Sequence, residues 1–368
     1  MYFEDDFFRL ESPKLTESEK IKMSKEYSES LKNAREKAKL DRCLLCNKTC
    51  TSFCNSHTIP QFIMKELSKN GNYFCMNTLI GMPTSKQIVG TKEAITFHTI
   101  CNECDQIYFR TYENPDSYLS GLSQKLLAEV ALKNNLRLLS KKIIENEMLL
   151  DKYKNIEESS FQALNFLEAI ETNELDIKET LKSIELAKDT IKGKKDGYYL
   201  IDYIKLDYVA KMAFQSKVAL VCGFDGELIN DIYYKNAKYK IQCLHISVFP
   251  MKGGTYIFLF IENGDKRYSK FYKHYRKLSL DEKLKVVNYI ILKYSEEWLL
   301  SSNIEKTILN NKGLSDAVRT ISIPKPRLSF FGGKDINELE LKNELLSKAI
   351  SLYSLKNLPD IPNFLKKD

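Results

Sequence analysis

Two Cys-x-x-Cys pairs, Cys43/Cys46 and Cys101/Cys104, constrain this chain more than any other feature of its sequence. Each pair can offer two thiolates from one tight turn, and two such pairs complete a tetrahedral zinc site. The roughly 55 residues between the pairs exceed the usual zinc-ribbon spacing and leave room for a small folded insert. We therefore predict a structural Zn²⁺ ion bound by all four cysteines.

Other residues near the pairs keep alternative ligand sets open. Cys50 and Cys54 could replace one pair, and His57 could ligate the zinc or cap a turn instead of acting chemically. The acidic start of the chain lacks the apolar segment of a secretory signal peptide. Clustered cysteines in such a chain favour metal binding over disulfides, and we expect a cytoplasmic protein. The apolar runs are too short to span a membrane.

Length and charge allow several domains and an anionic partner. The chain has 368 residues and a net charge of +7, which permits nucleic-acid binding without requiring it. The predicted regions are an N-terminal arm and helix (1–42), a zinc-stabilised module (43–116), a helical region (117–196) and an α+β region (197–368).

The apolar spacing predicts an α+β, α-rich fold whose larger body is mainly helical, with a small β-hairpin or sheet. Predicted helices cover residues 15–40, 60–69, 206–221, 279–298 and 336–355, and several antiparallel helices fill 117–191. Residues 241–249 and 255–261 are predicted to form the hairpin.

The insert between the cysteine pairs carries the candidate chemistry. Residues 55–58 are short and extended and end in Ser56-His57-Thr58, while the second pair leads into a predicted helix with Asp105 and Glu113. A histidine on a strand followed by an acidic helix is the layout of a one-metal phosphodiester nuclease. In that chemistry the histidine takes a proton from water, and a divalent cation stabilises the leaving oxygen.

These motifs together resemble a known family. The succession Cys-x2-Cys, Ser-His-x-Ile-Pro-x-Phe and Cys-x2-Cys-Asp-x3-Phe-x3-Glu is similar to the zinc-containing HNH, or His-Me finger, nucleases, among them bacterial proteins with Ser-His-Ile-Ile-Pro in this place. The resemblance covers about residues 43–113. It implies a zinc-stabilised ββα module, His57 as general base, and an endonuclease that hydrolyses nucleic acid, DNA more than RNA. It also implies a role in anti-phage defence.

The chain departs from the family pattern at two positions. Asp105 replaces an Asn that holds the catalytic loop by hydrogen bonds, and an ionised Asp accepts such bonds without donating them. The family's last His, a metal ligand, is missing, and Glu113 lies where it is often found. A carboxylate there suits Mg²⁺ or Mn²⁺. The resemblance thus implies His57, Asp105 and Glu113 as catalytic residues, with His98 as a further candidate.

A basic and aromatic segment, residues 266–277, bears on the substrate. Its cations are Lys266, Arg267, Lys270, Lys273, Arg276 and Lys277. They could contact phosphates while the interleaved rings stack on bases. The alternative is a strand edge whose lysines prevent aggregation and whose rings pack inward.

A second class of function stays open. The departures at Asp105 and Glu113 allow a catalytically inactive, zinc-stabilised subunit that binds nucleic acid or a protein, or one that serves only in assembly. The predicted helices of residues 117–192 offer surfaces for a homodimer or for a partner protein of a defence system.

Overall fold

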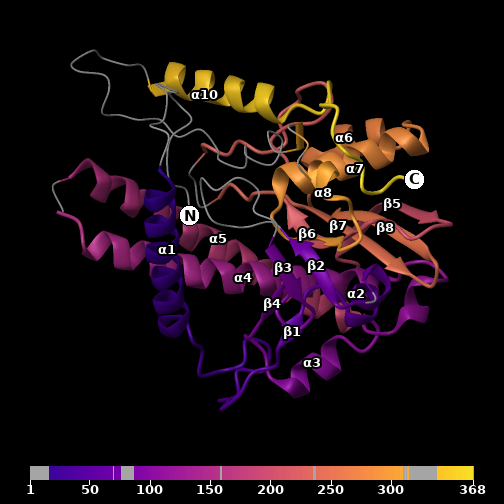
Figure 1. Cartoon of the computed structure of the whole chain (residues 1–368), viewed down its shortest axis with the longest axis horizontal. Coiled ribbons are helices and arrows are strands. Elements are labelled where there is room, and N and C mark those ends of the chain that lie inside the picture. The colour runs from indigo at the N-terminus through magenta and orange to yellow at the C-terminus, as the bar shows by residue number, and fades with distance from the viewer. Residues whose placement is uncertain are drawn as a thin grey trace.

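A seven-stranded antiparallel sheet lies at the centre of the fold in the order β3-β2-β9-β6-β7-β8-β5 (Figure 1). The computed structural model describes residues 16–68, 70–75, 87–157, 160–234, 238–309, 311, 313–314 and 338–367. The strands of this sheet are β2 Asn72–Cys75, β3 Gln87–Gly90, β5 Tyr198–Leu206, β6 Met212–Val218, β7 Leu244–Met251, β8 Gly254–Glu262 and β9 Trp298–Ser301. A separate pair joins β1 Ser56–His57 to β4 Thr96–Phe97.

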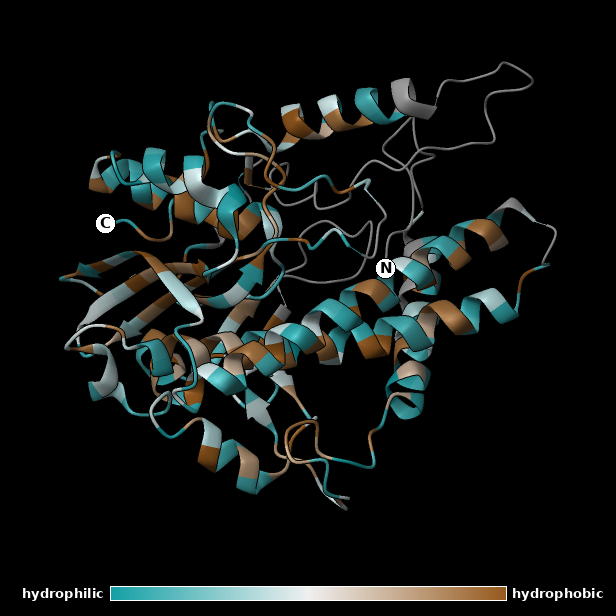
Figure 2. Cartoon of the chain, turned by 180° about the vertical axis from the view of Figure 1, so that it is seen from behind, coloured by the Kyte–Doolittle hydropathy of each residue, from teal (hydrophilic) through white to brown (hydrophobic). Residues whose placement is uncertain are grey.

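Helices cover both faces of the sheet. One face packs against α6 Ser269–Tyr275 and α7 Leu280–Tyr294, and the other against α2 Gln61–Leu67 and α4 Gln124–Lys154. Alternate residues of β8 enter the two cores: Ile257 and Leu259 enter the first, and Phe258 and Phe260 the second. The helices turn a hydrophilic side outward and a hydrophobic side toward the sheet (Figure 2).

The remaining helices surround these layers. They are α1 Glu17–Lys37, α3 Asn102–Tyr108, α5 Phe161–Ile191, α8 Lys306–Leu309 and α10 Glu338–Tyr353, with the 3-10 turns η1 Pro115–Tyr118 and η2 Lys266–Tyr268. Helices α4 and α5 form one long hairpin, and α1 lies across it. Thr16 and Glu19 form the predicted capping box of α1. Among the described ranges, no helix is long and apolar enough to cross a membrane.

The predicted β-hairpin is confirmed, and its turn explains its register. Strands β7 and β8 pair up to Met251 and Gly254, which leaves Lys252 and Gly253 as a two-residue turn. Both turn residues have positive φ, 51° and 74°. Such turns match the twist of the paired strands, and glycine adopts this conformation at little cost.

Several expectations from the sequence are wrong. Residues 206–221 are not a helix, because β5 ends at Leu206 and β6 occupies Met212–Val218. Both faces of the sheet are covered, so β6 begins with four consecutive buried residues, Met212 to Gln215, and lacks the alternation that distinguishes a strand from a buried helix. The sheet is accordingly much larger than the small sheet predicted, whereas the predicted α+β class is confirmed. Residues 117–191 form two long helices, α4 and α5, after the short turn η1.

The sheet also joins segments that are far apart in the chain. Strand β2, from the predicted zinc module, pairs with β9, with Tyr73 opposite Ser301. The predicted boundary at residue 116 is therefore crossed by the sheet and by the core that α2 and α4 share. The predicted end of the helix at residue 69 and the predicted start of the last helix at Ile336 lie outside the described residues.

Candidate functional site

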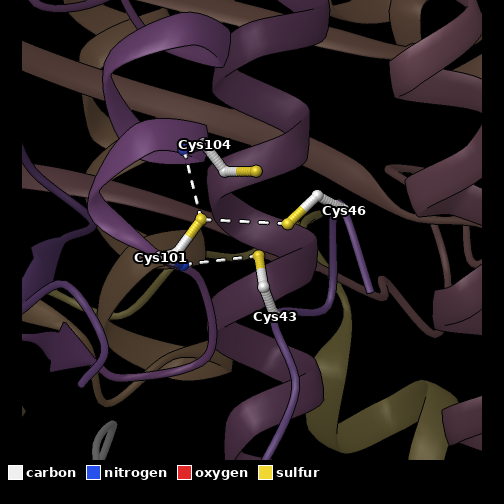
Figure 3. Close-up of side chains that lie close together, drawn as sticks. All are labelled: Cys43, Cys46, Cys101 and Cys104. Carbon is white, nitrogen blue, oxygen red and sulfur yellow. Dashed lines mark hydrogen bonds between the residues drawn. The ribbon is translucent and has the colours of Figure 1, made fainter. Parts of the chain in front are cut away.

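The four predicted zinc ligands meet between a loop and the start of α3. Their Sγ atoms all lie within 4.8 Å of one another (Figure 3). The Sγ atoms of Cys46 and Cys101 are 3.9 Å apart. A tetrahedral ion with zinc–sulfur bonds of about 2.3 Å needs sulfurs about 3.8 Å apart. The cluster is therefore consistent with a structural metal site.

Backbone N–H groups donate hydrogen bonds to two of the four cysteine sulfurs. Cys43 Sγ accepts hydrogen bonds from the N–H groups of Leu45 and Cys101, and Cys101 Sγ accepts one from Cys104. Hydrogen bonds to sulfur favour the thiolate, which is the form that binds metal. Cys50, Cys54 and His57 are not members of the converging group, so the alternative ligand sets are not those of this structure.

His57 lies on the two-residue strand β1, opposite Thr96 of β4, and only 8% of it is exposed. Its Nε2 lies 2.9 Å from the carbonyl oxygen of Thr91. A carbonyl only accepts hydrogen bonds, so Nε2 carries the proton and Nδ1 keeps the free electron pair. Burial lowers the pKa of His57, against the opposing effect of the Thr91 carbonyl. The ring is thus in the tautomer that carries its proton on Nε2 and an electron pair on Nδ1.

Asp105 belongs to a hydrogen-bonded group that the sequence did not reveal. Its Oδ1 accepts from Ser56 Oγ at 2.6 Å and from Lys133 Nζ at 2.9 Å. Lys133 Nζ also lies 2.6 Å from Ser56 Oγ and 4.0 Å from Glu113 Oε1. Burial would raise the pKa of Asp105, but the Lys133 ammonium and the Ser56 hydroxyl lower it on balance. Glu113 is partly exposed, but desolvation by the surrounding protein raises its pKa, an effect that Lys133 opposes and the Asp105 carboxylate reinforces.

The predicted catalytic cation does not fit this arrangement. Within the described ranges, the four cysteines are the one group of three or more metal-ligating side chains that converges. Asp105 Oδ1 instead accepts from the ammonium of Lys133, which also lies 4.0 Å from Glu113 Oε1 and offsets one of the two negative charges. A divalent ion would need carboxylate oxygens that are free to ligate it.

Two predicted site residues lie differently from expectation. Helix α3 ends at Tyr108, so Glu113 is not on it and lies in the turn that follows, where its side chain is exposed. His98 is exposed just beyond β4, on the other side of the strand from the buried Phe97, whose ring lies near Lys133. The structure brings together Ser56, Asp105, Glu113 and Lys133, whereas the ring of His57 hydrogen-bonds to the carbonyl of Thr91 and to none of these four.

A signal for Lys133 was present in the sequence. It continues the buried spacing of Leu126 and Val130 along α4, and a lysine in such a position must find a partner inside the protein. Leu126, Val130 and Lys133 are all buried on that face of the helix. A lysine at an apolar position of a predicted helix therefore indicates a buried ion pair with an acidic residue elsewhere in the chain.

The basic segment 266–277 forms η2 and α6 and is not a strand edge. The rings of Tyr268, Phe271 and Tyr275 are buried in the core, as the alternative interpretation predicts, and cannot stack on bases. The arginines are engaged within the protein: Arg267 with Asn230 and a carbonyl of Lys240, and Arg276 with carbonyls of β5. Arg276 is nevertheless exposed, as are the lysines of the segment, Lys266, Lys270, Lys273 and Lys277.

A buried carboxylate beside the site gives the protein a pH-dependent stability. Glu129 of α4 is fully buried and accepts the backbone N–H of Tyr112 at 2.6 Å. Burial raises its pKa to about 7. The folded state therefore holds a proton that the unfolded state releases, so the stabilisation is complete below the unfolded pKa and is lost as the pH rises through about 7.

We predict that Glu129→Gln removes this pH dependence. The wild-type free energy of unfolding should fall by about 3 kcal/mol between about pH 4 and pH 8 through this group, whereas an amide has no proton to lose. Urea unfolding at a series of pH values measures the difference. Glu171→Gln, an exposed change on α5, is the matched control. Parallel curves for wild type and Glu129→Gln would contradict the prediction.

The comparisons with known proteins add no relative. No protein-family model matches the chain, and no curated protein or solved structure matches it either.

Proposed function

We propose that the protein hydrolyses phosphodiester bonds of nucleic acid, DNA in preference to RNA, in the manner of an HNH-like endonuclease. The observation that carries the proposal is the tautomer of the His57 ring. Its Nε2 is engaged by the Thr91 carbonyl, which leaves Nδ1 to take a proton from an attacking water. The four-cysteine cluster supports this strand–loop–helix unit as a structural metal site, and the resemblance to the HNH family gives the reaction class.

The exposed lysines of residues 266–277 are proposed to contact the phosphate backbone. Lys266, Lys270, Lys273 and Lys277 follow one another at four-, three- and four-residue intervals, so they lie along one side of a helical segment. Such a row of cations contributes sequence-independent affinity that depends on salt. Stacking on aromatic rings is not part of this proposal, because three of the segment's four rings are buried.

Cleavage assays test the proposed reaction. Plasmid, single-stranded DNA and RNA are incubated with the zinc-loaded protein, with Mg²⁺, with Mn²⁺ and with neither ion added. We expect cleavage of DNA that is lost in His57→Ala while zinc content and melting temperature are retained. Absence of cleavage under every condition, or equal cleavage by His57→Ala, would overturn the proposal.

A second function is favoured by one observation. The ammonium of Lys133 lies against Asp105 and near Glu113, where a nuclease of the resembling family would hold its metal. An inactive module that binds nucleic acid or a partner protein fits that arrangement. Binding of DNA with no cleavage in any arm of the assay would favour this second function.

We predict that Lys270→Ala combined with Lys273→Ala weakens DNA binding and reduces its salt dependence. Loss of two phosphate contacts should lower the slope of log K against log salt by about 2. Fluorescence anisotropy at several salt concentrations measures it. Arg276→Ala is the contrasting variant, because its guanidinium binds the carbonyls of Leu200 and Ile201. It should lower the melting temperature and leave the slope unchanged, and the opposite pattern would contradict the prediction.

A further inference from the structure

Lys133 is a buried cation with defined partners. Its side chain is 1% exposed, and its Nζ donates to Ser56 Oγ and to Asp105 Oδ1. The ring of Phe109 lies 4.1 Å from the ammonium, and those of Tyr112 and Phe97 lie further away. Taking an ammonium out of water is unfavourable unless charge and hydrogen bonds compensate for it. The residue is therefore held tightly, and it is too deeply buried to contact a substrate.

The three partners come from three different elements. Ser56 belongs to β1, Asp105 to α3 and Lys133 to α4. Ser56 Oγ donates to Asp105 and accepts from Lys133, so the hydrogen bonds close a ring among the three side chains. We call this ring the Ser56–Asp105–Lys133 clamp.

The clamp acts on the residue that precedes His57. Strand β1 has only two residues and pairs with a two-residue partner, so its own ladder supplies few hydrogen bonds. Neighbouring side chains of a strand point to opposite faces. With Ser56 fixed in the clamp on one face, His57 is directed to the other, where Thr91 accepts its Nε2–H.

A second residue of α4 fixes the partner strand. Arg137 lies one helical turn beyond Lys133 and donates to the carbonyl of Thr96 at 2.7 Å, opposite His57 in the ladder. Its guanidinium is itself paired with Glu297 at 2.6 Å. One face of α4 thus holds both short strands.

We propose that Lys133 is a positioning residue, which through the Ser56–Asp105–Lys133 clamp fixes strand β1 and the orientation of the His57 ring. Removing the ammonium frees Ser56 and leaves the Asp105 carboxylate with no cation in contact. An amide at position 105, which can both donate and accept, should restore a neutral clamp when Lys133 is also absent. The inference rests on the proposed function only for its effect on catalysis.

The experiment observes the His57 ring directly. The chain has four histidines, so ¹⁵N-resolved NMR can assign the His57 ring nitrogens and the Nε2 proton. We expect Lys133→Met to lower the melting temperature by roughly 5–10 °C and to abolish the protected Nε2 proton signal. The double variant Lys133→Met with Asp105→Asn should recover both. Lys154→Met, an exposed lysine at the end of the same helix, is the matched control and should leave the His57 signals unchanged.

Ser56→Ala provides the second variant, because it removes only the hydroxyl that joins β1 to the clamp. It should loosen the His57 ring even if Lys133→Met fails to fold. In the cleavage assay both single variants should lower kcat about tenfold or more with little change in KM. Unchanged His57 ring signals in Ser56→Ala, or destabilised Lys133→Met with a normal Nε2 proton, would overturn the inference. Altered ring signals in a protein that never cleaves would support the clamp and overturn the proposed function alone.

Discussion

Replacing Cys104 by Ser is expected to release the metal and unfold the segments around it. A structural zinc contributes about 10–16 kcal/mol of apparent free energy in small zinc domains, as much as or more than the whole stability of a typical protein. The four sulfurs are contributed by two segments, the loop at Cys43/Cys46 and the start of α3, which are otherwise joined by a few contacts such as the hydrogen bond from the Leu44 N–H to the Thr99 carbonyl. Without the ion, four thiol groups would face one another with only the N–H groups of Leu45, Cys101 and Cys104 hydrogen-bonded to their sulfurs.

Zinc content and thermal unfolding measure this effect. Wild type should bind about one zinc per chain, and Cys104→Ser far less, with a large fall in melting temperature and rapid proteolysis near residues 43–57. Cys50→Ser is the matched control, because Cys50 lies close in sequence but outside the converging group. Full zinc retention by Cys104→Ser, or loss of zinc in Cys50→Ser, would contradict the assignment of ligands.

Replacing His57 by Ala is expected to lower kcat about 10²- to 10⁴-fold, which is the usual contribution of a general base. The buried ring makes one hydrogen bond, to Thr91, so its loss should affect stability far less than catalysis. Steady-state cleavage of a fluorogenic oligonucleotide measures the change. Zinc content and melting temperature must stay close to wild type for the comparison to be valid.

The pH dependence of the wild-type reaction tests the same residue independently. A general base works when it is unprotonated, and burial lowers the pKa of His57 below its usual value of 6.5. Activity should therefore be constant through neutral pH and fall only on the acid side, with a midpoint below 6.5. A midpoint above that value, or the same acid limb in the residual activity of His57→Ala, would contradict the role of this ring.

Local patterns in the sequence predicted the parts of the fold that depend on local physics. The capping box at Thr16, the hairpin at Lys252–Gly253 and the convergence of the two cysteine pairs each follow from a few neighbouring residues. The two cysteines of a Cys-x-x-Cys pair lie on one tight turn and so stay close together in any fold. The four-cysteine site could therefore be predicted without knowledge of the rest of the fold.

Features that depend on distant segments could not be predicted in this way. Strand β6 was predicted to be a helix because burial of its first residues removes the alternation that is typical of a strand. That burial depends on distant segments that pack around β6, including the paired strands β7 and β9, and the residues of β6 do not specify them. The contact of Lys133 with Ser56 joins positions that no short motif links. Asp105 and Glu113 were expected to hold an ion, because the sequence does not show that a lysine from α4 reaches them.

Because β2 pairs with β9, the central sheet cannot be completed until both strands have been synthesised. Strand β2 ends at Cys75, and its partner begins at Trp298. At ribosomal rates of about 5–20 residues per second, β2 leaves the ribosome roughly 10 to 45 seconds before that partner exists. Tyr73 and Phe74, both buried in the finished sheet, have no strand to pair with on that side during the interval. We expect nascent chains stopped before β9 to be captured by chaperones through this segment, and those stopped after the C-terminal residues to be released.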